Sequence, residues 1–284
     1  MENSPVPLLV KHVRQAWRGP DTIAAEWQDL GFTAAPDFDR AVAEHDRFAA
    51  VLEQAGAHLT WLPAGEGVGL DSIYVRDASI MGDRGLILAQ MGKAQRRGEP
   101  AAQGLALEAL HFPIAGAIEP PGTVEGGDVT WLDERTMVVG RGYRTNDEGI
   151  RQLRGLVSDR VEMVVVPLPH WRGPGDVFHL MSILSPVDRN LAVVYAPLLP
   201  ASFHETLAAR GIELIDVPHA EFETMGANVL AVAPRRCVVL SGNPITRARL
   251  ERAGAHVFEY GGEEISLKGG GGPTCLTRPL ILAP

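Results

Sequence analysis

Residues 129–140 have the sequence Val-Thr-Trp-Leu-Asp-Glu-Arg-Thr-Met-Val-Val-Gly, in which three polar residues separate two mainly apolar runs. Branched and aromatic side chains dominate both runs, and such residues favour extended strands. The short polar segment Asp133-Glu-Arg135 is typical of the turn of a β-hairpin. The stretch therefore predicts two antiparallel strands.

The same pattern recurs in three other parts of the chain, at intervals of roughly fifty residues. It covers residues 72–91, 181–195 and 229–240, with polar turns near 82–85, 188–190 and 234–236. In the first of these, the charged pair Arg76-Asp77 interrupts an apolar run. A charged pair inside a core strand is costly unless it is paired or binds something.

A second recurring unit predicts a helix that ends at a glycine and continues into a strand. The three glycines are Gly56, Gly211 and Gly254, each with a leucine four residues before it. That spacing is typical of a last apolar helical contact followed by a left-handed glycine cap. Apolar runs at residues 7–13 and 276–283 could pair as a fifth unit. We therefore expect one α/β domain over residues 1–284, built as a ring of five units.

Composition excludes several classes of protein. The net charge is −9, which argues against nucleic acid as a partner because phosphate binding needs clustered Lys and Arg. No 18-residue apolar run exists, so we expect no membrane span, and the first residues lack the pattern of a secretory signal. Two cysteines in a chain of this size predict free thiols and a cytoplasmic location.

Cys275 is the first candidate for chemistry. It follows Lys268-Gly-Gly-Gly-Gly-Pro-Thr274, a loop whose glycines allow backbone to approach a ligand. An accessible cysteine at such a place suits a nucleophile. Cys237 lies in the apolar run Cys-Val-Val-Leu and is predicted to be buried in the core.

A cysteine nucleophile needs a group that manages protons, which is usually a histidine. The chain has nine. His58 and His256 occupy equivalent places in two repeats, which favours a structural role, and His170 lies in a Pro/Gly-rich loop. His179 opens the third hairpin, a position typical of active sites, and is the histidine that we predict as acid/base.

Carboxylates occupy similar positions in the first two hairpins. Asp77 lies in the first strand of one, and Glu125-Gly-Gly-Asp128 comes directly before the other. The alternative for the second motif is a solvated loop. In a ring of repeats, however, equivalent positions converge on the axis, so we expect Asp77, Glu125, His179 and Cys275 to lie around one point.

Five motifs in this order resemble the guanidine-modifying, or pentein, superfamily of arginine and agmatine deiminases, amidinotransferases and dimethylarginine dimethylaminohydrolases. They are Tyr74-Val-Arg-Asp77, Arg96-Arg-Gly-Glu99, Glu125-Gly-Gly-Asp128, Arg144-Thr-Asn146 with Gly149, and Gly271-Gly-Pro-Thr-Cys275 with Pro279-Leu280. The resemblance implies a five-bladed ββαβ propeller, closed by its N- and C-terminal strands. It also implies a hydrolase that needs no metal or organic cofactor.

The resemblance further implies a role for each matching residue. Cys275 would be the nucleophile and His179 the acid/base. The carboxylates of Asp77 and Glu125 would clamp the planar guanidinium, with Glu125 counted among the catalytic residues. The substrate-binding set would comprise Arg144 and Arg97 for the α-carboxylate, together with Asp71, Asp128 and the backbone of Gly269.

The sequence favours one branch of the superfamily. Deiminases typically carry an acid two residues after the histidine, whereas this chain has His179-Leu-Met181, which suits an N-alkylated guanidinium. Arg76 before Asp77, in contrast, is closer to deiminases and amidinotransferases. We expect a dimethylarginine hydrolase, with arginine or agmatine deiminase, amidinotransferase and a non-catalytic pentein binding protein as alternatives. The expected partner is a small guanidino substrate, and a homodimer is one option for assembly.

Overall fold

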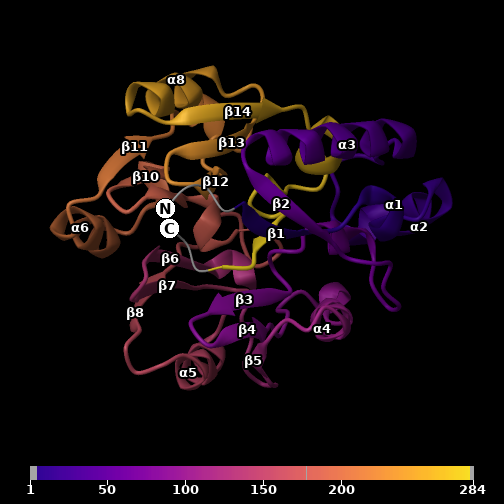
Figure 1. The fold of residues 1–284 in the computed structure, drawn as a ribbon, viewed down its shortest axis with the longest axis horizontal. Helices are drawn as coiled ribbons and strands as arrows, with labels where there is room; N and C mark the ends of the chain where they lie inside the picture. The colour runs from indigo at the N-terminus through magenta and orange to yellow at the C-terminus, as the bar shows by residue number, and fades with distance from the viewer. Residues whose placement is uncertain (1–4, 177, 282–284) are drawn as a thin grey trace.

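The computed structural model describes residues 5–176 and 178–281. Its strands form five three-stranded sheets. In Figure 1 these sheets follow one another around the centre of the molecule in the order of the sequence. The strands are β1 (Val6–Val10), β2 (Ala57–Trp61) and β15 (Arg278–Pro279); β3 (Ser79–Gly82), β4 (Gly85–Leu88) and β5 (Ile114–Ala117); β6 (Val129–Asp133), β7 (Thr136–Arg141) and β8 (Glu162–Pro167); β9 (Leu184–Asp188), β10 (Leu191–Val194) and β11 (Glu213–Asp216); and β12 (Leu230–Ala233), β13 (Arg236–Leu240) and β14 (His256–Tyr260).

All five sheets have the same topology. The middle strand pairs antiparallel with one neighbour and parallel with the other. In four sheets the antiparallel pair is a predicted hairpin. In the fifth, β1 pairs with β15 from the other end of the chain, with Leu8 opposite Pro279 and Leu9 opposite Arg278. This pairing was predicted, although residues 282 and 283 of the predicted strand lie outside the described residues.

Helices connect the middle strand of each sheet to its parallel partner. Three of these connections end at the glycines that the sequence indicated, with φ of 97° at Gly56, 69° at Gly211 and 83° at Gly254. This left-handed conformation favours glycine because it has no Cβ. The connecting helices are α3 (Phe38–Gln54), α4 (Glu99–Ala109), α5 (Asp147–Leu156), α6 (Ala201–Ala209) and α8 (Pro244–Arg252); the others are α1 (Val13–Ala16), α2 (Pro20–Leu30) and α7 (His219–Phe222).

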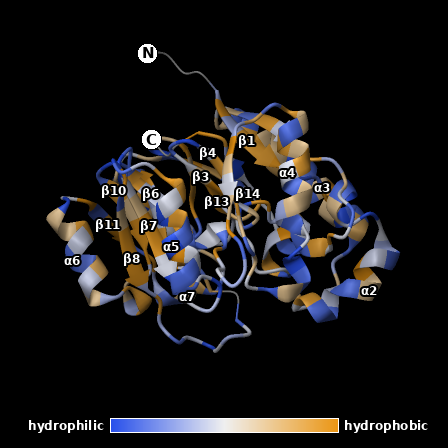
Figure 2. Ribbon diagram, turned by 90° about the horizontal axis from the view of Figure 1, so that it is seen from below, coloured by the Kyte–Doolittle hydropathy of each residue, from blue (hydrophilic) through white to orange (hydrophobic). Residues whose placement is uncertain are grey.

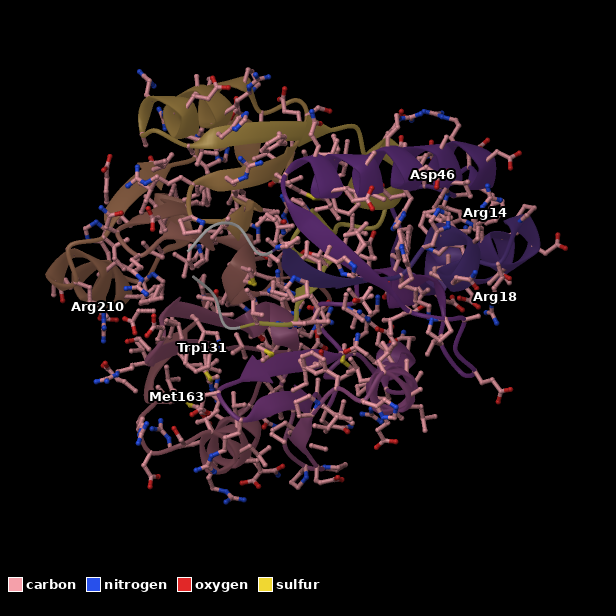
Figure 3. The ribbon with its side chains drawn as sticks, viewed as in Figure 1. Arg14, Arg18, Asp46, Trp131, Met163 and Arg210 are labelled. Carbon is pink, nitrogen blue, oxygen red and sulfur yellow. The ribbon has the colours of Figure 1, made fainter. Side chains whose placement is uncertain are left out.

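Apolar residues are concentrated on the strands, and the helices carry many polar residues (Figure 2). Neighbouring sheets are also joined by polar contacts. Trp131 of β6, labelled in Figure 3, donates from Nε1 to the carbonyl of Met81 in β3 at 2.9 Å. Arg236 of β13 donates to the carbonyl of Ala55, next to β2. Among the described residues, no helix has the length and apolar character needed to cross a bilayer.

Two predicted strand boundaries are wrong, and both errors concern the site. Residues 72–78 form no strand: a 3-10 turn covers Leu70–Ile73, and β3 begins only at Ser79. In the third hairpin another 3-10 turn covers Leu180–Ser182, and β9 begins at Leu184. Polar residues such as Asp77 would be buried among apolar neighbours within a strand, whereas a loop lets them turn toward other polar groups.

Candidate active site

Each of the five sheets contributes a polar loop residue that comes shortly before the antiparallel edge strand. Asp77 precedes β3, Glu125 precedes β6, His179 precedes β9, Asn228 precedes β12 and Cys275 precedes β15. Because the sheets share one topology, these loops all lie at corresponding places. The fold therefore brings five chemically different side chains toward the same region.

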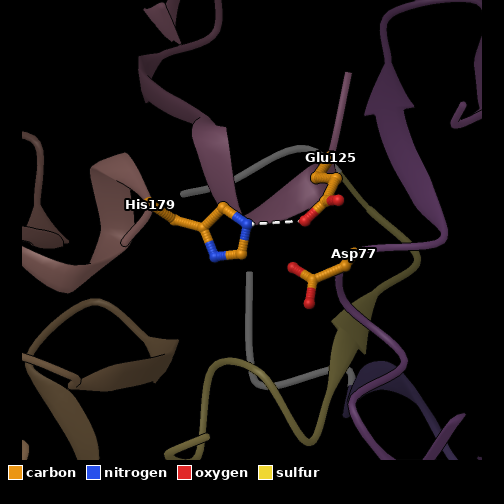
Figure 4. A group of neighbouring side chains, drawn as sticks. All are labelled: Asp77, Glu125 and His179. Atoms are coloured by element: carbon orange, nitrogen blue, oxygen red, sulfur yellow. Dashed lines mark hydrogen bonds and ion pairs between the residues drawn. The ribbon is translucent and has the colours of Figure 1, made fainter. Parts of the chain in front are cut away.

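Glu125 and His179 form a buried hydrogen-bonded pair. Nε2 of His179 lies 2.8 Å from Oε2 of Glu125, as the dashed line in Figure 4 marks. The other Glu125 oxygen, Oε1, accepts the backbone N–H groups of Gly92 and Lys93. Arg144 Nη1 lies 3.2 Å from Oε2. Both oxygens of Glu125 are thus fully engaged in this structure.

The charges of this pair hold a proton on the imidazole. Burial by itself would lower the pKa of His179, but the carboxylates of Asp77, Asp128 and Glu125 outweigh it and raise this pKa to about 9. Burial would likewise raise the pKa of Glu125, but His179 and Arg144 hold it well below its usual range. His179 is therefore an imidazolium at neutral pH.

Asp77 has one oxygen paired and one free. Its Oδ2 accepts from Nη1 of Arg96 at 2.6 Å, and the same guanidinium makes two bonds to Glu99. Its Oδ1 is buried without a hydrogen-bond partner among the described residues. In Figure 4 the Asp77 carboxylate points into the space next to the hydrogen bond between His179 and Glu125. A buried carboxylate oxygen without a donor is suited to an N–H group supplied by a ligand.

Asp128 contributes charge and structure. Its Oδ2 accepts from the hydroxyl of Thr145 at 2.7 Å, and its Oδ1 accepts the backbone N–H of Leu180 at 3.0 Å. The second bond fixes the turn that carries His179. Burial, as the largest cause, raises the pKa of Asp128 to about 6. Of the two acids in the Glu-Gly-Gly-Asp motif, Asp128 is thus committed to holding neighbouring loops.

Cys275 is half-buried, and its sulfur has polar neighbours. Nδ2 of Asn228 lies 3.5 Å from Sγ, and the hydroxyl of Thr274 lies 3.8 Å from it. Burial and then the charge of Asp77 raise the pKa of the Cys275 thiol, so the resting sulfur is protonated. Cys237, in contrast, is fully buried in β13, and burial raises the pKa of its thiol to about 12.

Two adjoining cavities meet at these residues. Both are lined by His179, Cys275, Gly269 and Gly270. The outer cavity has a volume of about 290 Å³ and includes the apolar side chains of Phe178, Met181 and Met225. The inner cavity, of about 20 Å³, is charged. Its remaining lining residues are Asp71, Tyr74, Asp77, Lys93, Arg96, Arg144 and Gly271.

Glycine is required at two places in this wall. A Cβ at Gly269 would lie 2.0 Å from the Tyr74 hydroxyl oxygen, and a Cβ at Gly127 would lie 2.8 Å from both Asp77 Oδ1 and His179 Nδ1. No larger residue fits without displacing these groups. The glycines of the Glu125–Asp128 and Lys268–Cys275 loops thus let backbone approach the site.

The predicted residues are brought together with two exceptions, Asp128 and Arg97. Asp128, predicted to bind substrate, is fully buried and lines neither cavity, because its two oxygens hold Thr145 and Leu180. Asp71, Asp77, Arg144, His179, Gly269 and Cys275 line the inner cavity, and Glu125 contacts it through His179 and Arg144. Arg97, however, is exposed and lines neither cavity, whereas its neighbour Arg96 is buried beside Asp77. The Arg96 side chain points into the cavity because its guanidinium donates hydrogen bonds to the carboxylates of both Asp77 and Glu99.

Three residues in the site were not singled out from the sequence. Lys93 and Arg96 line the inner cavity, and Asn228 contacts the sulfur. A signal for Asn228 existed, because it precedes the fourth hairpin by the same two residues that separate Asp77 from β3. Lys93 had no such signal, since its partners come from distant parts of the chain.

Asp77, Glu125 and His179 also have the composition of a metal site. One potential ligand atom from each lies within 4.8 Å of the others. The guanidinium groups of Arg96 and Arg144 already contact these carboxylates, and Nε2 of His179 is hydrogen-bonded to Glu125. This charge balance disfavours a divalent cation and favours proton transfer.

Comparisons with known proteins agree with this architecture. In Pseudomonas aeruginosa, N(G),N(G)-dimethylarginine dimethylaminohydrolase is 28% identical over 243 residues, which cover 85% of this chain and 89% of that protein. The arginine deiminase of Mycobacterium marinum is 34% identical over 191 residues but is covered to only 47%.

Solved structures share the fold. The Pseudomonas dimethylarginine dimethylaminohydrolase in complex with citrulline superposes with a TM-score of 0.77 at 24% identity, covering 97% of this chain and 100% of that one. The N-terminal domain of ArgZ, a cyanobacterial arginine dihydrolase, bound to its product, gives 0.82 at 18% identity and 99% coverage of both chains. The family model described as N,N dimethylarginine dimethylhydrolase, eukaryotic, matches residues 33–282. This chain therefore belongs to the dimethylarginine dimethylaminohydrolase family of the pentein superfamily.

Proposed function

We propose that this protein hydrolyses a C–N bond of a guanidinium group through a covalent intermediate on Cys275. The reference substrate is an N-methylated arginine, which would yield citrulline and methylamine or dimethylamine. The observation that supports this most directly is the free, buried Oδ1 of Asp77 in a cavity shared with His179 and Cys275. Membership of the family and the five-module fold agree with the proposal.

Binding begins with the cation. The planar guanidinium donates one N–H to Asp77 Oδ1 and another to Oε2 of Glu125, and both are charge-assisted hydrogen bonds. Glu125 becomes available when Arg144 moves off it. Arg144, with Arg97 turning in from the surface, then binds the carboxylate at the other end of the substrate. The backbone of Gly269 adds a further contact, and Asp71 would contact the substrate only in competition with Lys93, its partner in this structure.

Chemistry begins when the bound cation lowers the pKa of the nearby thiol, which releases its proton to solvent. The Cys275 thiolate adds to the central carbon and forms a C–S bond. The His179 imidazolium gives its proton to the departing amine, the C–N bond breaks, and a thiouronium intermediate remains. Neutral His179 then takes a proton from water as the oxygen adds to the same carbon. The C–S bond breaks with its electron pair returning to sulfur, and the hydroxyl proton of the adduct passes to solvent. This leaves a neutral ureido product, the Cys275 thiolate and the His179 imidazolium.

The leaving group is proposed to be an alkylated amine. Phe178, Met181 and Met225 line the outer cavity beside Cys275 and His179, and apolar side chains accommodate methyl groups better than bare N–H donors. Arginine deimination is the second candidate. It is favoured by Arg76 before Asp77 and by the partial match to mycobacterial arginine deiminase.

We also infer that the five sheets close into a propeller. The pairing of β1 with β15 supports this inference because it builds one sheet from both ends of the chain. A closed ring gives every catalytic loop two fixed neighbours, which is what a site assembled from five loops requires.

The experiment is a substrate panel assayed for ureido product: arginine, monomethylated and dimethylated arginine, and agmatine. Methylated arginine should turn over faster than arginine. Cys275→Ser should abolish turnover, while Cys237→Ala, in the core, should retain it. If no guanidino compound turns over and none protects Cys275 from alkylation, the proposed function is wrong. Equal loss in both cysteine variants would mean that the nucleophile is misplaced.

A further inference from the structure

Lys93 occupies a binding site for a primary ammonium group inside the inner cavity. Its Nζ lies 2.6 Å from Oδ2 of Asp71 and 2.7 Å from the carbonyl oxygen of Leu30. Leu30 is the last residue of α2, and the C-terminal carbonyls of a helix carry partial negative charge. The side chains of Lys93 and Asp71 are only 14% and 6% exposed. The protein's own side chain thus fills a partly buried cation site.

The other acids around this cavity are also paired. Arg96 neutralises Asp77 through Oδ2 and Glu99 through both oxygens. Of the two carboxylates that line the cavity, Asp71 is paired with Lys93 through Oδ2, and Asp77 keeps Oδ1 buried without a partner among the described residues. That oxygen accommodates the guanidinium. A second positive charge on the substrate would have to share Asp71 with the Lys93 ammonium or displace it.

Arg144 is a cation that would lose its carboxylate partner when substrate binds. It is held by Glu125, and its side chain is 8% exposed. When the substrate guanidinium takes its place on Glu125, Arg144 becomes a nearly buried cation without a partner, which is unfavourable. A carboxylate on the substrate removes that penalty. Lys93 lines the same cavity and adds positive charge there.

We propose that Lys93 determines specificity, and that the preferred substrate is a guanidino carboxylic acid without an ammonium group beside its carboxylate. This inference rests on the proposed function and narrows its substrate class. The substrate guanidinium, a cation, would bind Asp77 and Glu125. The substrate carboxylate, an anion, would bind Arg144. The α-ammonium of arginine would have to compete with the Lys93 ammonium for Asp71 and the Leu30 carbonyl.

The test compares pairs of compounds that differ only in the ammonium group. Arginine and 5-guanidinopentanoate, each with and without Nω-methyl groups, are assayed for kcat/KM with the unaltered protein. We expect a preference of at least about tenfold for the compounds without the ammonium, since an unpaired buried polar group is penalised on this scale. Agmatine, which lacks the carboxylate, should be poorer than 5-guanidinopentanoate.

Two variants assign the preference to Lys93. Lys93→Met keeps an unbranched side chain that is shorter by the last atom and frees Asp71 and the Leu30 carbonyl, so the preference should shift toward arginine by at least about tenfold. Lys93→Arg keeps the charge and should keep the preference. A general structural defect would lower turnover of both compounds equally, so the ratio within one variant separates specificity from folding.

The outcomes distinguish the two proposals. If the unaltered protein uses arginine compounds as well as their counterparts without the ammonium, the inference about Lys93 is overturned while the proposed function stands. An unchanged ratio in Lys93→Met also overturns it. Binding measured by calorimetry in Cys275→Ser should give the same order of affinities without turnover. If no compound of either type binds or turns over, both proposals fail.

Discussion

Nε2 of His179 lies 2.8 Å from Oε2 of Glu125, and both side chains are buried. Since Arg144 contacts the same carboxylate, Glu125 remains ionised and His179 remains protonated. The pair therefore stores the proton that a departing amine needs. A neutral histidine in this place would have to acquire that proton during the reaction.

Glu125→Gln should impair proton transfer. The amide keeps the shape of the side chain but removes a negative charge that raises the pKa of His179. The histidine should then lose its proton at a lower pH, and the alkaline limb of the kcat profile should move to lower pH. We expect kcat to fall by about 10²–10⁴-fold, the usual contribution of a general acid.

The control for this variant is Glu148→Gln, which removes a half-buried carboxylate that lines neither cavity and should leave the pH profile in place. If the alkaline limb of Glu125→Gln coincides with that of the unaltered protein, His179 is not the group that titrates. The pH profile therefore tests the pair more directly than the loss of rate does.

The thiol of Cys275 should be slow to ionise in the free protein. Burial and Asp77 raise its pKa, so less thiolate is present at any given pH than for an ordinary cysteine. The rate of alkylation by iodoacetamide should keep rising beyond pH about 8.5, where ordinary thiols are half ionised. Asp77→Asn removes a nearby negative charge and should move the curve to lower pH. A plateau below pH 8 in the unaltered protein would contradict this account.

Arg96→Met should destabilise the protein. Arg96 is the partner of two buried carboxylates, Asp77 and Glu99, and removal of one member of a buried ion pair typically costs about 3–5 kcal/mol. The free energy of unfolding from urea denaturation measures this. Arg151→Met removes an exposed guanidinium that contacts Glu148 with the same three-residue spacing, and should cost less than about 1 kcal/mol.

The loss in Arg96→Met should also depend on pH. Burial already raises the pKa of Glu99 to about 7, and without Arg96 this pKa rises further. A carboxyl whose folded pKa exceeds its unfolded value binds more protons in the native state, so stability increases as pH falls. The variant should therefore recover part of its stability between pH 8 and pH 5. A loss that is constant over this range would mean that Glu99 stays ionised.

The fold could be predicted because its units repeat. Apolar runs and polar turns recur often enough to locate four hairpins, and three helix-ending glycines mark the connections. The strand starts near Asp77 and Met181 could not be placed, because an apolar run does not reveal where a 3-10 turn replaces a strand. At these points tertiary contacts of polar groups override local propensity.

The site was predictable where position in the repeat carried the information. Asp77, Glu125, His179 and Cys275 stand before equivalent strands, so their convergence follows from topology. The choice between Arg96 and Arg97 does not follow, because both are arginines and only the pairing of Arg96 with Glu99 turns it inward. Which of two adjacent arginines points into the cavity depends on side-chain direction. Sequence spacing alone does not give that direction.

Asn228 should support the nucleophile as a hydrogen-bond donor. Its Nδ2 lies 3.5 Å from Cys275 Sγ, while its Oδ1 accepts from the backbone N–H and hydroxyl of Thr274. Asn228→Asp keeps the acceptor for Thr274 but replaces the donor to sulfur with a carboxylate oxygen. The thiolate then loses a hydrogen bond and gains a negative neighbour, which raises the pKa of the thiol. The alkylation curve of Cys275 should move to higher pH, and kcat/KM should fall by about 10²-fold or more, as when one preorganised donor is removed.

Asn190→Asp, in an exposed turn, adds the same charge away from the cavities and should change neither quantity. An Asn228→Asp protein whose alkylation curve matches that of Asn190→Asp would show that Asn228 only holds the Thr274 loop.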